Sequence, residues 1–376
     1  MISVKNQYVC KLDIGDYKDF VHGVDLIELL YVEDSAMRLP VIEISFILRN
    51  PDVLNYLNEG SVLTVGLGQT EISMLDLKFR ITTDLSEHKP SIGQTVFITG
   101  ILDVEDFINT QKYSSYQNLS SLEVVKNVAK KHFSKFKTNL STTNDVQTWQ
   151  QAGTDWNFLK NVCASGYYND STFLVGGFDC DTFYYYDFRK KIQDAAQGLE
   201  PLYILSKNRT GDNVLNYNTA RATNSSTATA KVVGYNNANV EYNWLDYSIQ
   251  LYKDNLQGFA SLETNKLPIK NDVNIVSYID SGFNDSDIKN IALTNNTRNM
   301  LLNSNINIFV TTGGQFKRLH LFDIVLFDET SDYRLCGLST ITRVAYQITQ
   351  SQLFTNITLV RESFNGLSGD LQSVGK

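Results

Sequence analysis

Short segments in which apolar and polar residues alternate recur along residues 1–108 of the chain. This period-two alternation places apolar side chains on one face of a β-strand and polar side chains on the other. Several such strands at short spacing are typical of a small barrel or sandwich. We therefore expect an N-terminal β-barrel domain over residues 1–108. The alternating segments lie at residues 41–48, 61–68, 75–81 and 95–102.

The periodicity then changes to about 3.6 residues, which indicates helices. Ser120 and Glu123 have the spacing of a capping box. In that motif the Ser120 hydroxyl accepts a hydrogen bond from the backbone N–H of Glu123, and the Glu123 carboxylate reaches back to Ser120. The residues expected on the buried face of this helix are Leu122, Val125, Ala129 and Phe133.

A second helix is predicted to begin after Thr154. Thr154 is a suitable N-cap, Asp155 is favourable in the first turn, and Gly166 is a good stop. Two strands are expected next, at residues 172–177 and 182–188. We therefore predict an inserted α/β domain over residues 109–207.

The polar stretch at residues 208–226 predicts a linker or long loop, because it has almost no apolar residues. A second β-barrel with a helix at residues 286–303 is expected over residues 208–362, followed by a flexible Gly/Ser-rich tail at 363–376. The expected fold is α+β and mainly β, with two small β-barrel domains and an inserted α/β domain. Strands of the second barrel are predicted at residues 231–233, 247–251, 306–310, 324–327, 338–344 and 354–360.

The two β regions share an order of features. Each has an alternating strand, at residues 62–67 in the first region and 324–327 in the second. Each also has a strand that opens with glycine, at Gly100 and Gly337. This shared order suggests the hypothesis that the second β region is a duplicate of the first.

The charge balance excludes several classes of partner. The chain has 33 Lys and Arg against 41 Asp and Glu, a formal net charge of −8, and a pI near 5.1. Nucleic-acid-binding proteins need a basic surface to neutralise phosphates, so no sequence-specific nucleic-acid binding is expected. No apolar run approaches the ~18 residues of a membrane span, and the start of the chain lacks a signal-peptide pattern. We therefore expect no membrane insertion, and we expect the protein to be made in a cytosol.

Residues that commonly bind metals or carry catalysis are not grouped in this sequence. The cysteines form no CxxC pair, which argues against a zinc ribbon or a thioredoxin-type site. No two histidines share a helical face at metal-ligand spacing, and His132 is expected at a surface or boundary position. We therefore predict no catalytic, cofactor-binding or metal-binding residues. The cysteines are Cys10, Cys163, Cys180 and Cys336, and the histidines are His22, His88, His132 and His320.

Two features each keep a second interpretation. Asp179 and Asp181 flank the tip of a predicted hairpin, where an Asp-rich turn is the common explanation and a Ca²⁺ site is the alternative. Tyr184, Tyr185 and Tyr186 could form a stacking platform. On a strand, however, the outer two face one way and the middle one faces the other, so sheet packing with water-exposed hydroxyls is favoured.

Residues 149–159 combine a polar run, a short gap, Thr154 and Asp155, the aromatic Trp156, and then Phe-Leu at the start of a helix that ends near Gly166. This order resembles a segment of the contractile-tail hub family. The family includes the baseplate hub proteins of tailed phages and the bases of type VI secretion spikes.

The end of the chain is similar to that family as well. The similarity covers residues 337–361 and the strand pair around residues 313–325. One departure concerns the last barrel turn, where the family often has glycine before an aspartate. This chain has Phe322 before Asp323 at that place.

The resemblance implies a structural protein rather than an enzyme, without cofactors. It implies the central hub of a phage tail baseplate, a homotrimeric adaptor that joins the sixfold tail tube to the threefold spike. The trimer would form the channel for the tape-measure protein and then for DNA during genome ejection. The implied partners are a separate spike protein, tail tube proteins and other baseplate proteins, and the implied location is the virion.

Two functions of other classes stay open beside this one. A tail-associated cell-wall-degrading enzyme would need a carboxylate pair, which sequence spacing does not reveal. A carbohydrate-binding adhesin would suit a chain with 20 Tyr and many Asn. The spike base of a contractile injection system is a close variant of the hub.

Overall fold

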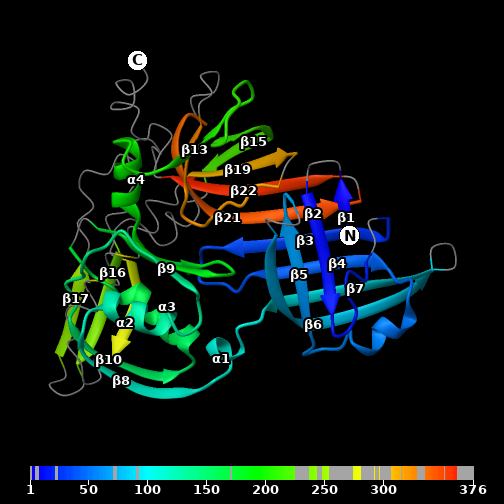
Figure 1. Ribbon diagram of the computed structural model, residues 1–376. Helices are drawn as coiled ribbons and strands as arrows, with labels where there is room; N and C mark the ends of the chain where they lie inside the picture. Colours follow the sequence, from blue (N-terminus) through cyan, green and yellow to red (C-terminus); the bar gives the residue numbers. More distant parts are fainter. Residues whose placement is uncertain are drawn as a thin grey trace.

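Strands dominate the computed structural model of the protein, and helices are few (Figure 1). The class expected from the sequence, α+β and mainly β, is confirmed. Closure of the β regions into barrels stays a prediction. The structure describes residues 2–4, 8–21, 24–70, 74–89, 93–169, 172–224, 237–243, 248–253, 274–280, 292, 296, 306–314, 316–327, 335–350 and 352–361.

The N-terminal β region is an antiparallel run of strands in the order β1-β2-β5-β6-β7-β4-β3. All four strands predicted here form, and β6 continues past the predicted end at residue 81 to Lys89. The elements are β1 (Ile2–Val4), β2 (Tyr8–Ile14), β3 (Leu26–Asp34), β4 (Val41–Ile47), η1 (Pro51–Asn55), β5 (Val62–Gly68), β6 (Leu75–Lys89) and β7 (Gly93–Leu102).

The C-terminal β region corrects the predicted linker at residues 208–226. This stretch contains β14 and β15, and β15 pairs antiparallel with β19. Its polar sequence escaped the alternation rule because β15 pairs with only one described strand, so few of its side chains are buried. The elements are β13 (Leu202–Leu205), β14 (Val214–Leu215), β15 (Tyr217–Asn224), β19 (Ile306–Gly313), β20 (Ile324–Phe327), β21 (Gly337–Thr349) and β22 (Leu353–Arg361).

The two β regions contain the same five-strand unit. The first β unit has the neighbour order β5-β6-β7-β4-β3, and the second β unit has the order β20-β21-β22-β19-β15. Every neighbouring pair in both units is antiparallel. The hypothesis of a duplication is therefore supported. Gly100 and Gly337 are not equivalent, however, because Gly100 lies inside β7 while Gly337 opens β21.

Irregularities fall at matching positions in the two units. The register of β6 shifts between Ile81 and Thr83, and that of β21 shifts between Ile341 and Arg343. The register also shifts between Leu26 and Glu28 in β3 and between Tyr217 and Thr219 in β15. A β-bulge is a specific feature of a fold and not a random defect. Because the register shifts occur at matching positions, they define which residue of one unit corresponds to which residue of the other.

The two units join edge to edge. Strand β3, drawn in blue, pairs antiparallel with the second half of β21, drawn in orange (Figure 1). Tyr31 and Tyr346 are opposite each other in this pairing and stack with ring centroids 6.0 Å apart. One apolar core continues across both units, with Tyr31, Phe79, Tyr346 and Leu359 among its members. The joint is therefore a continuous sheet with a shared core.

The inserted region has its own core and contains most of the helices. Both helix starts predicted from sequence are confirmed, since Ser120 forms a complete capping box and the Thr154 side chain accepts from the backbone N–H of Asn157. Helix α4 was not expected. The elements are α1 (Glu105–Ile108), β8 (Lys112–Leu119), α2 (Ser121–Ala129), β9 (Lys135–Lys137), β10 (Gln147–Gly153), α3 (Asp155–Ser165), β11 (Leu174–Phe178), β12 (Thr182–Asp187) and α4 (Phe188–Ala196).

Gly166 ends α3 for a reason other than a left-handed backbone. Its φ of −67° is open to any residue. A Cβ at this position would lie 1.9 Å from the hydroxyl oxygen of Tyr185. The glycine is therefore required by close packing.

Strands β8 and β10 form a two-stranded sheet, β11, β12 and β9 form a three-stranded sheet, and a third small sheet has the order β17-β16-β18. Strand β17 agrees with the strand predicted at residues 247–251. The strand predicted at 231–233, the tail at 363–376 and most of the helix predicted at 286–303 lie outside the described residues. Within that helix, Ala292 and Asn296 are described, and both are helical and buried. The strands are β16 (Asn237–Asn243), β17 (Ser248–Lys253) and β18 (Asn274–Asp280).

Replacing Ser120 with alanine is expected to lower the free energy of unfolding by about 1 kcal/mol, because the backbone N–H of Glu123 loses the Ser120 hydroxyl as its acceptor and the Glu123 carboxylate loses the hydrogen bond from that hydroxyl. Urea denaturation followed by circular dichroism measures the change. Ser141→Ala is the matched control, since Ser141 is exposed in a loop. Equal midpoints for the two variants would contradict a stabilising role for the capping box.

Candidate functional site

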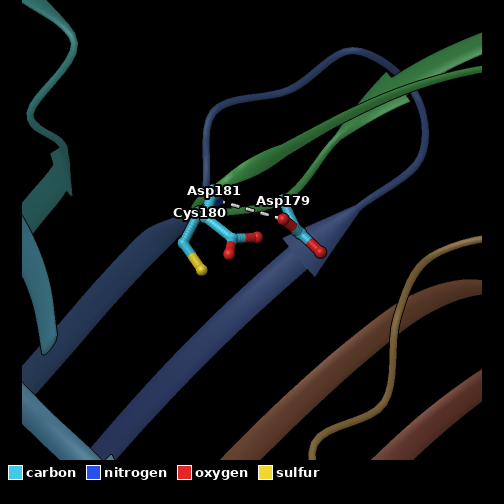
Figure 2. A group of neighbouring side chains, drawn as sticks. All are labelled: Asp179, Cys180 and Asp181. Atoms are coloured by element: carbon cyan, nitrogen blue, oxygen red, sulfur yellow. Dashed lines mark hydrogen bonds between the residues drawn. The ribbon is translucent and has the colours of Figure 1, made fainter. Parts of the chain in front are cut away.

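The tip of the β11–β12 hairpin is a turn closed by Asp179. One carboxylate oxygen of Asp179 accepts from the backbone N–H groups of Asp181, at 3.1 Å, and Thr182, at 2.9 Å. Figure 2 shows this hairpin tip with Asp179, Cys180 and Asp181. The turn interpretation of the Asp-rich sequence is therefore confirmed. It reflects the ability of an aspartate side chain to bond to the backbone two residues ahead.

The other carboxylate oxygen of Asp179 points into a buried cluster of polar side chains. It accepts a hydrogen bond from the Tyr184 hydroxyl at 2.6 Å and lies 2.9 Å from Nδ1 of His320. A guanidinium nitrogen of Arg318 lies 3.2 Å away. Asp179 is completely buried, so these contacts replace the water that its charge has lost.

Arg318 joins this cluster to the first β unit. It donates two hydrogen bonds to the carboxylate of Glu33 on β3, at 2.8 and 2.7 Å, and Glu33 is completely buried. The Tyr31 hydroxyl also donates to Glu33. We call Glu33, Asp179, Tyr184, Arg318 and His320 the junction cluster. Its members come from β3, from the β11–β12 hairpin and from the loop before β20, so it ties three regions together.

The pKa values follow from this burial. Burial by itself raises the pKa of Asp179, but the contact with His320 and the charge of Arg318 outweigh it and hold that pKa well below its usual range. Burial raises the pKa of Glu33, although Arg318 favours its charged form. Burial also lowers the pKa of Arg318 by itself, but the charge of Glu33 outweighs this and raises it well above its ordinary value. The guanidinium is therefore a permanent positive charge between two buried carboxylates.

The stability that Asp179 provides should depend on pH in a defined direction. Its native pKa is depressed below the ~3.9 of an unfolded chain, so its contribution is present above about pH 4 and is lost as the pH falls below that value. We expect the difference in unfolding free energy between the wild type and Asp179→Asn to shrink from pH 6 to pH 3.

A matched control for that measurement is Asp323→Asn. Burial raises the pKa of Asp323, so its linkage has the opposite sign. The wild type should lose stability relative to Asp323→Asn as the pH rises above about 4. The same slope for both variants would contradict the assignment of charges in the junction cluster.

The hairpin tip brings together three potential metal-ligand atoms. Ligand atoms of Asp179, Cys180 and Asp181 lie within 4.8 Å of one another. Protein cations already approach them, since Lys135 pairs with Asp181 at 2.6 Å and Arg318 lies 3.5 Å from the Cys180 sulfur. Burial raises the pKa of Cys180 to about 12, which disfavours the thiolate that binds metals. The expectation of no catalytic, cofactor-binding or metal-binding residues stays a prediction.

A second polar cluster surrounds Asp155 at the start of α3. Asp155 is completely buried and accepts from Lys112 and from the Gln151 amide at 2.7 Å. Nε2 of His132 lies 2.7 Å from the same carboxylate. As a residue His132 is intermediate in exposure, which fits the expected boundary position, although only 8% of its side chain is exposed. Asp155 therefore ties the turn after α2, the start of β8 and strand β10 to the first residue of α3.

The three consecutive tyrosines alternate as predicted. Tyr184 and Tyr186 pack in one apolar cluster, and Tyr185 packs in another on the opposite face of the hairpin. The expectation of water-exposed hydroxyls is wrong for Tyr184 and Tyr185, because their hydroxyls bond to Asp179 and Ser121 inside the protein. Buried hydroxyls require such partners.

Sequence reasoning missed Glu33 and Arg318. A signal for Glu33 was available, since Leu29 and Tyr31 occupy the inward positions of β3 and the period of two places Glu33 inward as well. Arg318 lies in a loop without periodicity, and its partner is 285 residues away, so no local pattern could reveal the pair.

None of the helices within the described ranges has the length and apolar character needed to cross a membrane. No protein-family model matches the sequence, and a search of curated proteins finds no match.

Similar solved structures come from phage tails and from type VI secretion. The tail protein from Neisseria meningitidis MC58 matches with a TM-score of 0.57 and 11% identity, over 95% of this chain and 97% of that one. The 43 kDa tail protein of prophage MuSo2 from Shewanella oneidensis matches with a TM-score of 0.60 and 11% identity, over 95% and 99%. The E. coli c3393 protein is a type VI secretion component with structural similarity to the T4 tail proteins gp27 and gp5. It matches with a TM-score of 0.50 and 11% identity, over 94% of this chain and 77% of that one. The chain therefore has the fold of phage tail proteins and type VI spike-related proteins, which confirms at the level of fold the resemblance seen in its sequence.

Proposed function

We propose that this chain is the structural central hub of a bacteriophage tail baseplate. In this proposal three copies form an adaptor between the sixfold tail tube and the threefold spike. The observation that carries it is the end-to-end likeness to two phage tail proteins, which covers nearly the whole of this chain and of each relative.

The duplicated β unit supports the trimeric form of the adaptor. Each chain carries two units with the same strand order and the same bulges. Three chains therefore supply six similar units, which suit a sixfold tube on one side and a threefold spike on the other. Closed cyclic symmetry of this kind is the usual form of homo-oligomers.

The remaining parts of the proposal follow from the same assembly. The ring would enclose a channel for the tape-measure protein and then for DNA, and its acidic balance would keep DNA from binding. Its partners would be the spike, tail tube and other baseplate proteins in the virion. We propose domains at residues 1–108, 109–207 and 208–362, with a tail at 363–376.

A non-enzymatic role also fits the described charged clusters. The carboxylates of Glu33, Asp155 and Asp179 are buried and already bonded to cationic or polar side chains. Groups held in this way stabilise a fold, whereas a catalytic carboxylate has to reach a substrate.

The test is the native mass of the purified chain by light scattering, alone and mixed with the spike protein of the same phage. A mass near three times 42.5 kDa in either state is the expected result. A monomer in both states would remove the proposal. Turnover of purified peptidoglycan and binding to a glycan array would then test the cell-wall-degrading enzyme and the adhesin.

A further inference from the structure

The second half of β6 has an edge without a strand partner among the described residues. Strand β5 pairs only with the first half of β6, as far as Arg80, while β7 pairs with the opposite edge from Phe79 to Lys89. Residues 82–87 are all exposed, and Leu85 is 60% exposed. In Figure 1 the β6–β7 hairpin projects past the end of β5 at the right of the molecule.

Strand β15 has an edge of the same kind. Its described pairing is with β19 on one side. It lies at the opposite end of the continuous sheet, which runs in the order β15-β19-β22-β21-β3-β4-β7-β6. Exposed edges of this kind are templates for pairing with another chain.

These two edges correspond to the two edges that join the units within the chain. The second half of β21 is the equivalent of the second half of β6, and β3 is the equivalent of β15. Within the chain, β21 and β3 pair with each other. The two edges that have no strand partner in the described part of the chain are therefore complementary to each other.

We propose that the second half of β6 in one copy pairs antiparallel with β15 of the next copy, in the register by which β21 pairs with β3. This inference rests on the trimeric adaptor proposed above and specifies its contact surface. The contact is head-to-tail, so it closes only when the ring is complete, and three copies then repeat the joint between units at every boundary.

The matching bulges determine the register. Leu85 occupies the place of Ala345, because both lie four residues after the shift that begins at Ile81 or Ile341. Thr223 occupies the place of Val32 by the same argument on β15 and β3. Since Ala345 is opposite Val32 within the chain, Leu85 is opposite Thr223 of the next copy.

The same correspondence places opposite charges face to face. Glu87 is equivalent to Gln347, and Arg221 is equivalent to Leu30. Within the chain, Gln347 and Leu30 are opposite each other. Glu87 and Arg221 are both exposed. Opposite charges directly across an antiparallel pair stabilise it and select its register. This complementarity favours a second copy as the partner of the edge.

Disulfide trapping tests the register. In the double variant Leu85→Cys/Thr223→Cys, mild oxidation is expected to give a covalent trimer on a non-reducing gel, since opposite residues lie within disulfide reach. The control is Leu85→Cys/Thr219→Cys, in which the second cysteine lies on the same face of β15 but about 13 Å further along. Each single variant measures the background from the four native cysteines.

Charge reversal gives an independent measurement. Glu87→Arg or Arg221→Glu alone should weaken association by roughly fivefold at each interface, and the double reversal should restore it. Light scattering over a dilution series provides the readout. Both positions are exposed on strands, so the variants should fold.

The outcomes separate this inference from the proposed function. A trimer that cross-links no better than the control pair, or that the double reversal does not restore, would remove the strand pairing and leave the hub proposal standing. A covalent dimer in place of a trimer would indicate pairing of like edges and would also contradict the inference. A monomer at every concentration and with the spike protein would remove both.

Discussion

Replacing Arg318 with alanine is expected to lower the free energy of unfolding by about 3–5 kcal/mol, the range measured when one partner of a buried ion pair is removed. The side chain of Arg318 is 19% exposed, and the carboxylates of Glu33 and Asp179 on either side of it are completely buried. Without the guanidinium both carboxylates would remain buried close to each other. They would have to take up protons or open the structure to water.

Urea denaturation of the purified variant measures this loss. Arg38→Ala is the matched control, because the Arg38 side chain is 74% exposed and its ion pair with Asp34 is 3.8 Å long. The control should leave the unfolding midpoint almost unchanged. Adding Glu33→Gln to Arg318→Ala should recover part of the loss, since one buried charge is removed. A loss below about 1 kcal/mol for Arg318→Ala would contradict the importance of the junction cluster.

Replacing Phe322 with alanine is expected to lower the free energy of unfolding by about 3–5 kcal/mol, as for other buried phenylalanines. Phe322 is 3% exposed and packs edge-on against Tyr184 and Tyr186, with ring centroids 5.9 and 6.0 Å away. It connects the loop before β20 to the β11–β12 hairpin. The cavity left by alanine would loosen this contact.

Phe322→Gly should be less destabilising than Phe322→Ala, because glycine relieves a left-handed strain of about 1–2 kcal/mol, which exceeds the cost of the slightly larger cavity. Phe322 has a φ of +66°, in the left-handed region, where only glycine is free of strain. Gly60 has a φ of +85° at the equivalent place in the first β unit. The backbone N–H of Gly60 bonds to Ile81, as that of Phe322 bonds to Ile341.

Thermal unfolding of the two Phe322 variants and of Gly60→Ala provides the comparison. A Cβ at Gly60 would meet no atom within 4 Å, so Gly60→Ala should lose only the conformational term of about 1–2 kcal/mol. A greater loss for Phe322→Gly than for Phe322→Ala would contradict the strain argument. Phe322 at this turn therefore has a strained backbone, where glycine would have none, but it gains a buried aromatic contact.

Local structure was open to prediction because it depends on near neighbours. The capping box at Ser120 and the N-cap at Thr154 involve atoms within a single turn, and both form as expected. The alternation of Tyr184, Tyr185 and Tyr186 follows from the geometry of a strand, and it also forms. The Asp179 turn belongs to the same group, since its bonds reach only two or three residues ahead.

Features that depend on distant segments were not open to prediction in the same way. Strand β15 was expected to be part of a linker. A polar strand of this kind can be identified only from its pairing, here with β19, because its own sequence lacks an apolar alternation. The hydroxyls of Tyr184 and Tyr185 were expected in water, because their partners come from other turns and other elements. The junction cluster was missed for the same reason.

The sequence by itself determined the alternating strands of the N-terminal β region, the capped starts of α2 and α3, the mainly β class and the order of features that marks the chain as similar to tail hub proteins. These properties are set by periodicity and by motifs, which act over a few residues. Only the tertiary structure decided that β3 pairs with β21, that Arg318 lies between two buried carboxylates, and that the second half of β6 and one side of β15 have no strand partner among the described residues. Edge pairing and buried ion pairs depend on which distant segments meet, because a backbone edge accepts almost any sequence and a charge is stable in the interior only beside its partner.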